Sequence, residues 1–391
     1  MSKPVILTGI RANNDLTIGN YFGAILPIID MAKKRSDEYQ INMFIPDLHS
    51  FTTPIDHSKL HDAILHNARV FVAAGLPLDN DYIYLYRQSY IPAHSELTII
   101  LDSFTGFGET SRMIQFKDKS GSQDFKKDLE FAKKHVEEMK LMFGYKYTEA
   151  DAFASTSLLL NALNKLQEKS ADDVSVGLFN YPVLMASDIL LYGARYVPVG
   201  DDQTQHLEFT RDIAERMNSK FGEIFIVPEA VKAQHEFFGK DQGLRIKDLI
   251  DPTKKMSKSD ESGRGVIFLS DEPAVAAKKV MGATTDDKAE INFDRENQPG
   301  ISNLLEILSL IQGVNLESVV QQYNGQTRYG DFKAIVAGEV EKFLTDFQKR
   351  LSEVDDNAVM AKLEQSERDM APIANATLLR AQQAVGLRPK V

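Results

Sequence analysis

The feature that most constrains the fold is an alternation of short apolar runs with helical patterns along the first part of the chain. Each run of strand-like residues leads through a polar turn into a segment whose apolar residues recur every three to four positions. Strands that alternate with helices form βαβ units, so the strands are parallel and helices cover both faces of the sheet. We therefore expect an α/β fold whose ligands bind at the carboxyl ends of the strands. The predicted strands span 4–8, 40–46, 82–86, 195–199 and 223–227, and the predicted helices span 19–34, 58–74 and 202–218.

Two regions depart from this alternation. Residues 122–173 are charged and helical in pattern, which predicts a helical hairpin inserted between two halves of the sheet. From about residue 271 the strand-like runs stop, and helical patterns continue almost to the last residue. We therefore expect a sheet domain over 1–265, interrupted by a helical insertion over about 94–180 with an extra segment at about 122–172, and an all-α domain over 266–391.

The composition excludes several classes of protein. The 391 residues include no cysteine, so disulfides, thiolate metal sites and cysteine nucleophiles are absent. No segment has the ~18 to 20 consecutive apolar residues of a membrane span. The apolar run near the start of the sequence is too short for the apolar region of a signal peptide. These features favour a cytoplasmic enzyme with no membrane partner. A net charge of −11 predicts that any contact with nucleic acid is confined to local features.

Nucleotide-binding patterns appear in an unusual form. No glycine is followed after four residues by Gly-Lys-Ser/Thr, and segment 106–111 lacks the third glycine of a dinucleotide fingerprint, which disfavours kinases, GTPases and dehydrogenases. Instead, the first predicted strand leads into a helix at 17–20 (Thr-Ile-Gly-Asn), where unpaired N–H groups attract anions and Gly19 allows a close approach. Segment 254–259 holds three lysines and two serines in a Pro- and Gly-flanked loop. Taken alone, such a charge run is typical of a solvated surface.

Together these two segments resemble a known pair of signatures. Lys-Met-Ser-Lys-Ser at 255–259 resembles the signature of the class I aminoacyl-tRNA synthetases, and 17–20 lies where that class carries His-Ile-Gly-His. Segments 181–192, 197–208 and 299–305 are similar to the tryptophanyl-tRNA synthetases of bacterial type. The resemblance covers nearly the whole chain apart from the extra segment.

The resemblance implies a Rossmann-like class I sheet with a helical insertion, followed by an all-α C-terminal domain that reads the tRNA anticodon. It also implies ATP-dependent attachment of L-tryptophan to tRNA(Trp) through tryptophanyl-adenylate, in a homodimer. ATP would act as its Mg²⁺ complex, with no metal bound by the protein itself. The partners implied are therefore tRNA(Trp), L-tryptophan and ATP.

The chemistry of this reaction explains the residue types in the two signatures. An amino-acid carboxylate attacks the α-phosphorus of ATP and is already ionised near neutral pH, so the protein mainly positions two anions and stabilises charge on the leaving pyrophosphate. Lysines on a mobile loop suit that task. The catalytic residues implied are Thr17, Asn20, Lys255, Ser257 and Lys258. The ATP-binding residues implied are Arg11, Ala12, Asn13, Gly19, Asn20, Gly200, Asp201, Asp202, Ile246, Lys255, Met256, Ser257, Lys258 and Ser259.

The resemblance also assigns a binding site for the amino acid. Asp188 would accept the indole N–H, and a buried carboxylate of this kind discriminates strongly against analogues that cannot donate. His49 and Gln203 would lie near the ammonium or carboxylate of the substrate. The tryptophan-binding residues implied are Leu7, His49, Tyr181, Met185, Asp188, Val197, Val199 and Gln203. Two positions depart from the family: Arg11 lies in a loop that usually reads Gln-Pro-Ser-Gly, and Leu7 replaces a common aromatic residue.

Three alternatives remain open from the sequence. A tyrosyl-tRNA synthetase shares the fold and both signatures, although 200–203 (Gly-Asp-Asp-Gln) follows the tryptophanyl pattern rather than Gly-Ser-Asp-Gln. A nucleotidyltransferase that does not act on tRNA could use the same fold, but the long helical C-terminal region disfavours it. A synthetase paralogue with a regulatory binding role is disfavoured by the intact Lys255, Ser257, Lys258 and Asp188.

Overall fold

The centre of the molecule is a four-stranded parallel sheet. The computed structural model describes residues 3–11, 16–53, 55–114, 175–198, 200, 203–238, 246–256 and 263–390. Within them the strands are β1 (Val5–Gly9), β2 (Gln40–Ile45), β3 (Ile83–Arg87) and β4 (Ala194–Tyr196), in the spatial order β3-β2-β1-β4. All three strand pairs are parallel, with Val5 opposite Gln40 and Ile41 opposite Ile83. The predicted parallel α/β fold is therefore confirmed.

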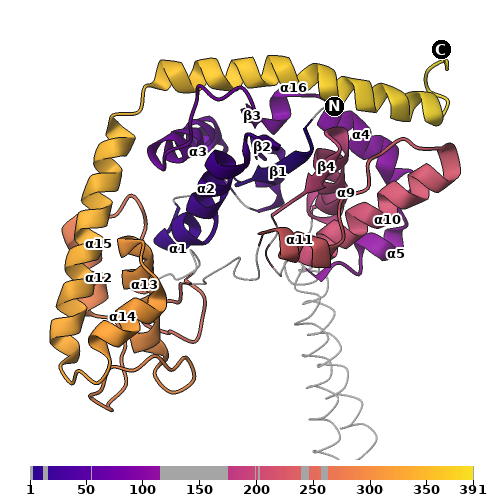
Figure 1. Ribbon diagram of the computed structural model, residues 1–391. Coiled ribbons are helices and arrows are strands. Elements are labelled where there is room, and N and C mark those ends of the chain that lie inside the picture. Colours follow the sequence, from indigo (N-terminus) through magenta and orange to yellow (C-terminus); the bar gives the residue numbers. More distant parts are fainter. Residues whose placement is uncertain are drawn as a thin grey trace, which may run out of the picture.

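The order of the strands creates a switch point beside β1. The chain passes from β1 to β2 and β3 on one side, and later returns to place β4 on the other side of β1. Side chains alternate between the two faces, because successive residues of a strand point in opposite directions. Ile6 belongs to the apolar cluster that includes α2 and α3, whereas Leu7 belongs to the cluster that includes α4, α9 and α10. Helices therefore cover both faces of the sheet (Figure 1). The helices described are α1 (Ile18–Asn20), α2 (Leu26–Arg35), α3 (Leu60–Ala73), α4 (Ala93–Asp102), α5 (Phe107–Thr110), α9 (Val176–Leu191), α10 (Thr204–Phe221), α11 (Val231–Phe238), α12 (Pro273–Met281), α13 (Pro299–Gln312), α14 (Leu316–Tyr323), α15 (Tyr329–Ser352) and α16 (Asp356–Ala384).

Pro27 lies at the start of the regular α-helix that follows β1. The chain continues from α1 through a π-helical turn, η1 (Tyr21–Ile25), into α2. Pro27 falls in the first turn of α2, where its missing N–H costs no helical hydrogen bond. The N–H of Leu26 reaches back to the carbonyl of Tyr21, so the wider turn absorbs the change of hydrogen-bonding pattern just before the proline.

The predicted strand at 223–227 is wrong. This segment pairs with no strand in the described part of the chain. The side chain of Asn218 takes the place of a neighbouring strand: its Oδ1 accepts the N–H groups of Ile224 and Phe225 (both 2.9 Å), and its Nδ2 donates to the carbonyl of Phe225 (2.8 Å). An apolar run can therefore be buried without joining the sheet when a side chain satisfies its backbone.

The C-terminal helices divide between two locations. Helices α12 to α15 pack on one another, whereas α16 runs back across the molecule and lies along the sheet edge at β3 (Figure 1). Ser366 and Glu367 of α16 accept the outward N–H groups of Leu85 (3.1 Å) and Arg87 (3.2 Å). These side chains cover an edge strand that would otherwise expose unpaired donors. Helix α16 thus packs on the sheet half of the molecule. The division into 1–265 and 266–391 stays a prediction, and the extra segment 122–172 lies outside the described residues.

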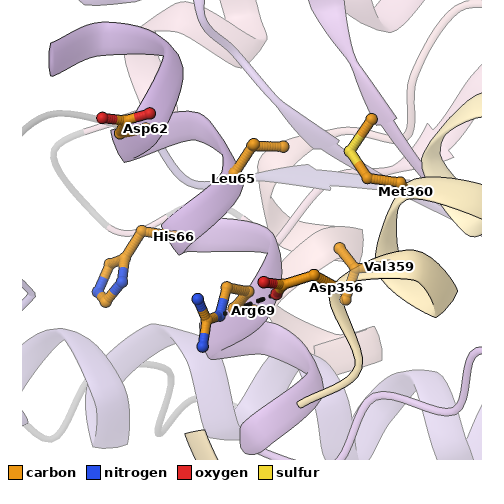
Figure 2. Close-up of a pocket in the computed structure, with 7 residues that line it drawn as sticks. All are labelled: Asp62, Leu65, His66, Arg69, Asp356, Val359 and Met360. Carbon is orange, nitrogen blue, oxygen red and sulfur yellow. Dashed lines mark ion pairs between the residues drawn. The ribbon is translucent and has the colours of Figure 1, made fainter. Parts of the chain in front are cut away.

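Arg69 connects α3 to the turn between α15 and α16. Arg69 on α3 pairs with Asp356 (3.3 Å) and donates to the carbonyl of Leu351 (3.2 Å) at the end of α15. Beside this pair lies a cavity of about 370 Å³, and its lining is mostly polar or charged toward α3 (Figure 2). No residue of the predicted site takes part in this contact or lines this cavity. The lining residues are Asp62, Leu65, His66, Arg69, Asp356, Val359 and Met360.

Candidate active site

The most strongly constrained polar group among the predicted site residues is the carboxylate of Asp188. Asp188 lies in the last two turns of α9 and is 1% exposed. A buried carboxylate is costly unless hydrogen bonds satisfy its oxygens. Three side chains from three other elements supply those bonds, so the site is built where several segments converge on one anion.

Two of the three donors come from the carboxyl ends of neighbouring strands. His49 lies in η2 (Leu48–Thr52), a 3₁₀ turn after β2, and its Nε2 is 2.8 Å from Oδ2 of Asp188. Gln88 begins η4 (Gln88–Tyr90), directly after β3, and its Nε2 donates to Oδ1 of Asp188 at 2.7 Å. The position agrees with the rule that ligands of parallel sheets bind at the carboxyl ends of the strands.

The third donor is a histidine that is itself held at both ring nitrogens. His94 lies in the first turn of α4 and is fully buried. Its Nδ1 is 2.6 Å from Oδ1 of Asp188, and its Nε2 is 2.8 Å from the hydroxyl of Tyr192. We call Asp188, His49, Gln88, His94 and Tyr192 the Asp188 cluster.

The electrostatics of the cluster keep Asp188 ionised. Burial alone would raise the pKa of Asp188, but the hydrogen bonds and charge interactions with His49 and His94 outweigh it and hold the pKa below its ordinary value. Burial raises the pKa of Tyr192 well above its ordinary value, so its hydroxyl stays protonated. The cluster therefore offers a permanent hydrogen-bond acceptor at neutral pH.

The apolar residues predicted to line the amino-acid site share one apolar cluster of the core. Leu7 and Val197 belong to the same apolar cluster as the inner face of α9, and Met185 packs against it. Tyr181 is buried on α9, its ring 6.3 Å from that of His49, and its hydroxyl is 2.8 Å from Nε2 of His206.

Gln203 precedes α10, where its N–H donates to the carbonyl of Gly200 at 2.8 Å. Val199 lies outside the described residues. Of the predicted tryptophan-binding residues, His49, Tyr181 and Asp188 lie close together, and the binding role of the set stays a prediction.

The first nucleotide signature forms a capped helix start. The hydroxyl of Thr17 accepts the N–H of Asn20 (3.1 Å), and Oδ1 of Asn20 accepts the N–H and the hydroxyl of Thr17 (both 3.1 Å). This reciprocal pair is a capping box. Thr17 is buried and its hydroxyl takes part in the cap, and its catalytic role stays a prediction.

The second signature lies against the first. A Cβ added to Gly19 would lie 3.8 Å from Cβ of Ile246 and 3.9 Å from Cβ of Met256, so the backbone at Gly19 lies within van der Waals reach of both residues. The N–H of Met256 donates to the carbonyl of Ile246 (3.0 Å), and Lys255 forms a backbone bridge with Lys247. Lys255 is exposed at the end of this paired segment. Two segments far apart in the sequence therefore meet.

Arg11 connects the first loop to the turn that carries His49. Its Nη1 donates to the hydroxyl of Thr52 (3.2 Å), and its carbonyl accepts Nδ2 of Asn67 (2.9 Å). Thr52 in turn donates to the carbonyl of His49 (2.8 Å), so Arg11 braces the end of η2. The remaining predicted residues of the nucleotide site lie outside the described residues, namely Ala12, Asn13, Asp201, Asp202, Ser257, Lys258 and Ser259.

Sequence reasoning missed three members of the Asp188 cluster: Gln88, His94 and Tyr192. A signal for Gln88 was present, because a polar residue directly after an apolar strand lies at the binding edge of a parallel sheet. His94 and Tyr192 carry no such signal, since their roles depend on how α4 packs on α9. Within the described ranges no group of three or more His, Asp or Glu side chains has a geometry suited to holding a metal ion.

Comparison with known proteins provides independent information on this arrangement. The chain matches the family model described as tRNA synthetases class I (W and Y) over residues 1–142 and 154–345. It is 36% identical to a tryptophan–tRNA ligase of Caldanaerobacter subterraneus over 98% of both chains. It is 37% identical to that of Leifsonia xyli, covering 98% of this chain and 97% of the relative. Among solved structures, the tryptophanyl-tRNA synthetase of Mycoplasma pneumoniae superposes with a TM-score of 0.74 at 29% identity, with 99% of each chain covered.

Proposed function

The chain belongs to the tryptophan–tRNA ligases, a family of class I tRNA synthetases, and from this premise we propose which of its residues carry the reaction. The enzyme attaches L-tryptophan to tRNA(Trp) with ATP, through a tryptophanyl-adenylate. The observation that best supports our assignment of the site is Asp188, a buried carboxylate kept ionised at the strand ends.

In this proposal Asp188 accepts the indole N–H of the amino acid. An ionised acceptor in an apolar site binds a donor strongly and leaves a buried charge poorly satisfied when the ligand cannot donate. Leu7, Met185 and Val197 supply apolar surface for the ring, and Tyr181 adds an aromatic face. We expected His49 near the ammonium or carboxylate of the substrate; its bond to Asp188 supports a role in fixing the acceptor instead.

ATP activation would use the two signatures that meet at Gly19. At the helix start the N–H of Ile18 donates to the carbonyl of Ile267 (3.0 Å) and that of Asn20 to the hydroxyl of Thr17 (3.1 Å), which leaves the N–H of Gly19 for a phosphate. Asn20 keeps its Nδ2 as a second donor, since its Oδ1 is used in the cap. Lys255, exposed beside this helix start, would stabilise charge that develops on the pyrophosphate. The acceptors on the phosphates are oxygens, the ligands that Mg²⁺ prefers, so we propose that Mg²⁺ enters with ATP.

We assign anticodon recognition to the unit formed by α12 to α15. Groups there that suit RNA contacts are partly engaged within the protein: the Tyr329 hydroxyl donates to Asp286 (2.7 Å), and Lys333 donates to the carbonyl of Ala283 (2.7 Å). Arg328 pairs with Asp331 at 3.0 Å. We therefore expect other exposed side chains of this unit to contact the unpaired bases.

We also propose that the enzyme acts as a homodimer. Large apolar side chains are exposed on α4, α5 and the start of α9, among them Ile99 (67%), Phe107 (75%) and Val176 (81%). Contiguous exposed apolar surface of this kind commonly marks a protein interface. None of the helices in the described ranges has the length and hydropathy needed to cross a bilayer. Because ATP and tRNA are its substrates, we propose that it works in the cytoplasm.

Amino-acid-dependent exchange between ATP and labelled pyrophosphate, with tryptophan, tyrosine and phenylalanine side by side, tests this function. We expect exchange with tryptophan, and a kcat/KM for the other two that is lower by about 100-fold or more. Exchange that depends on tyrosine instead would support the tyrosyl alternative. A second assay measures charging of tRNA(Trp), and failure to charge any tRNA despite normal exchange would favour an enzyme that does not act on tRNA.

A further inference from the structure

The Asp188 carboxylate has one acceptor position left after its partners are counted. A carboxylate offers about four lone-pair positions, two on each oxygen. Among the residues that the structure describes, Gln88 and His94 both donate to Oδ1, and His49 alone donates to Oδ2. The remaining acceptor position is therefore on Oδ2, beside His49.

We propose that His94 and Gln88 are specificity-determining positioning residues: by filling Oδ1 of Asp188, they orient the carboxylate so that its single remaining acceptor position, on Oδ2, receives the indole N–H. This inference rests on the proposed role of Asp188 and adds to it. Neither residue needs to touch the amino acid. Because they occupy Oδ1, a ligand can donate a hydrogen bond to Asp188 at only one remaining position.

The hydrogen bonds around His94 define its protonation and its orientation. Asp188 is ionised and can only accept, so Nδ1 of His94 must carry a proton. The hydroxyl of Tyr192 faces Nε2 of His94, so both ring nitrogens are engaged and the ring is held with Nδ1–H directed at Oδ1 of Asp188. The ring of Tyr192 packs edge-on against Tyr86, with centroids 5.5 Å apart, which fixes the hydroxyl.

Both donors are also anchored away from Asp188. The carbonyl oxygen of Gln88 accepts the N–H of Leu48 (3.1 Å), so its amide can present only its Nε2 to the carboxylate. Thr98 donates to the carbonyl of His94 (2.7 Å). The donors therefore have fixed positions relative to Asp188, as expected for groups that support a binding residue.

The test compares tryptophan with an analogue that cannot donate. In β-(benzothiophen-3-yl)-L-alanine, sulfur replaces the indole N–H, so the ring keeps its shape and loses the donor. The measurement is kcat/KM for each compound in ATP–pyrophosphate exchange, and the readout is the ratio between them. We expect a wild-type ratio of about 100 or more in favour of tryptophan.

Replacement of His94 should lower that ratio. His94→Phe fills similar space without a donor, and we expect the ratio to fall about tenfold or more, through a higher KM for tryptophan with little change for the analogue. His94→Asn, whose amide nitrogen can occupy the place of Nδ1, should retain most of the ratio. Ser187→Ala is the matched control, because it removes a buried hydroxyl beside Asp188 without touching the carboxylate, and its ratio should equal that of the wild type.

Two further variants keep the test decisive if His94→Phe does not fold. Gln88→Met removes the second donor to Oδ1 at similar volume, and Tyr192→Phe removes the hydroxyl that orients His94 while keeping the ring. Each should lower the ratio. An equal loss of kcat/KM for both compounds, with the ratio unchanged, would overturn the proposal. Failure of the proposed function itself is visible separately, as a wild-type enzyme that does not prefer tryptophan to tyrosine.

Discussion

Replacing Asp188 by asparagine should separate substrate recognition from folding, which replacement by alanine cannot do. In Asp188→Ala the buried donors of His49, Gln88 and His94 all lose their acceptor. Each unsatisfied buried group costs about 1 to 3 kcal/mol, and neighbouring losses are not additive. We therefore expect Asp188→Ala to lower the free energy of unfolding by on the order of 4 kcal/mol.

Asparagine preserves most of this network. Its Oδ1 can still accept from Gln88 and His94, while its Nδ2 faces Nε2 of His49, which accepts once His49 carries its proton on Nδ1. The cost to folding should then be about 1 kcal/mol. The acceptor for the indole N–H, however, has become a donor. The loss of a hydrogen bond to an ionised acceptor, about 1.5 to 3 kcal/mol, corresponds to a KM for tryptophan that is about 10- to 150-fold higher.

Urea unfolding and ATP–pyrophosphate exchange, measured on both variants and the wild type, test this prediction. The KM for ATP should change by no more than about twofold in Asp188→Asn, since that residue does not touch the nucleotide signatures. Equal increases in the KM values for tryptophan and ATP would refute the reasoning, because Asp188 would then be structural. If Asp188→Ala has the same free energy of unfolding as the wild type, the hydrogen-bond count is refuted.

The stability of the wild type should also depend on pH through Asp188. Its pKa is lower in the folded protein than in the unfolded chain, so its contribution to stability is present above its ordinary pKa of about 4 and is lost as the pH falls through the folded pKa. The difference in unfolding free energy between wild type and Asp188→Asn should therefore shrink below about pH 4. A difference that grows in acid would contradict the direction of the shift.

Three further variants probe the parts around the site. Lys255→Ala should lower kcat for exchange by about 100-fold and leave the KM for tryptophan nearly unchanged; an unaltered kcat would make Lys255 a surface residue. Gly265→Ala would push a Cβ into the carboxylate of Asp248, which caps the turn before Lys255, so activation should slow while tryptophan binding persists, and a normal rate would contradict this. Arg87→Met leaves the carboxylate of Glu367 buried without its cation and should cost about 3 kcal/mol of unfolding free energy in urea. Most of this should be recovered when Glu367→Gln is added, because the amide is neutral and its oxygen can still accept the N–H of residue 87; no recovery would refute the ion-pair explanation.

Local sequence patterns predicted the strands of the sheet well, but they did not predict how other segments pack around the sheet. The strands at 4–8, 40–46 and 82–86 are found within two residues of their predicted ends, because short apolar runs between polar turns have few alternatives in a chain of βαβ units. The run at 223–227 has the same composition and still forms no strand, since Asn218 satisfies its backbone. The pattern of a segment does not reveal which groups will satisfy its N–H and C=O.

Local sequence patterns also could not predict that α16 packs against the sheet edge at β3. Its helical periodicity is clear, but Glu367 is a charged residue in a charged helix, and nothing local marks it as the partner of Arg87. Asp188 could be assigned as the acceptor of the indole N–H because the sequence around it resembles that of the tryptophanyl-tRNA synthetases. His94, which holds it, could not be found, because that contact depends on two helices crossing at a particular point.

The most direct test of the account observes the indole N–H itself. The chain contains no tryptophan, so bound L-tryptophan provides the only indole N–H signal in a proton NMR spectrum of the complex. If Asp188 accepts this proton, its resonance should move downfield on binding, exchange slowly with water, and lose both properties in Asp188→Asn at saturating tryptophan. A bound ring whose N–H keeps the shift and fast exchange of free tryptophan in the wild type would contradict the central claim.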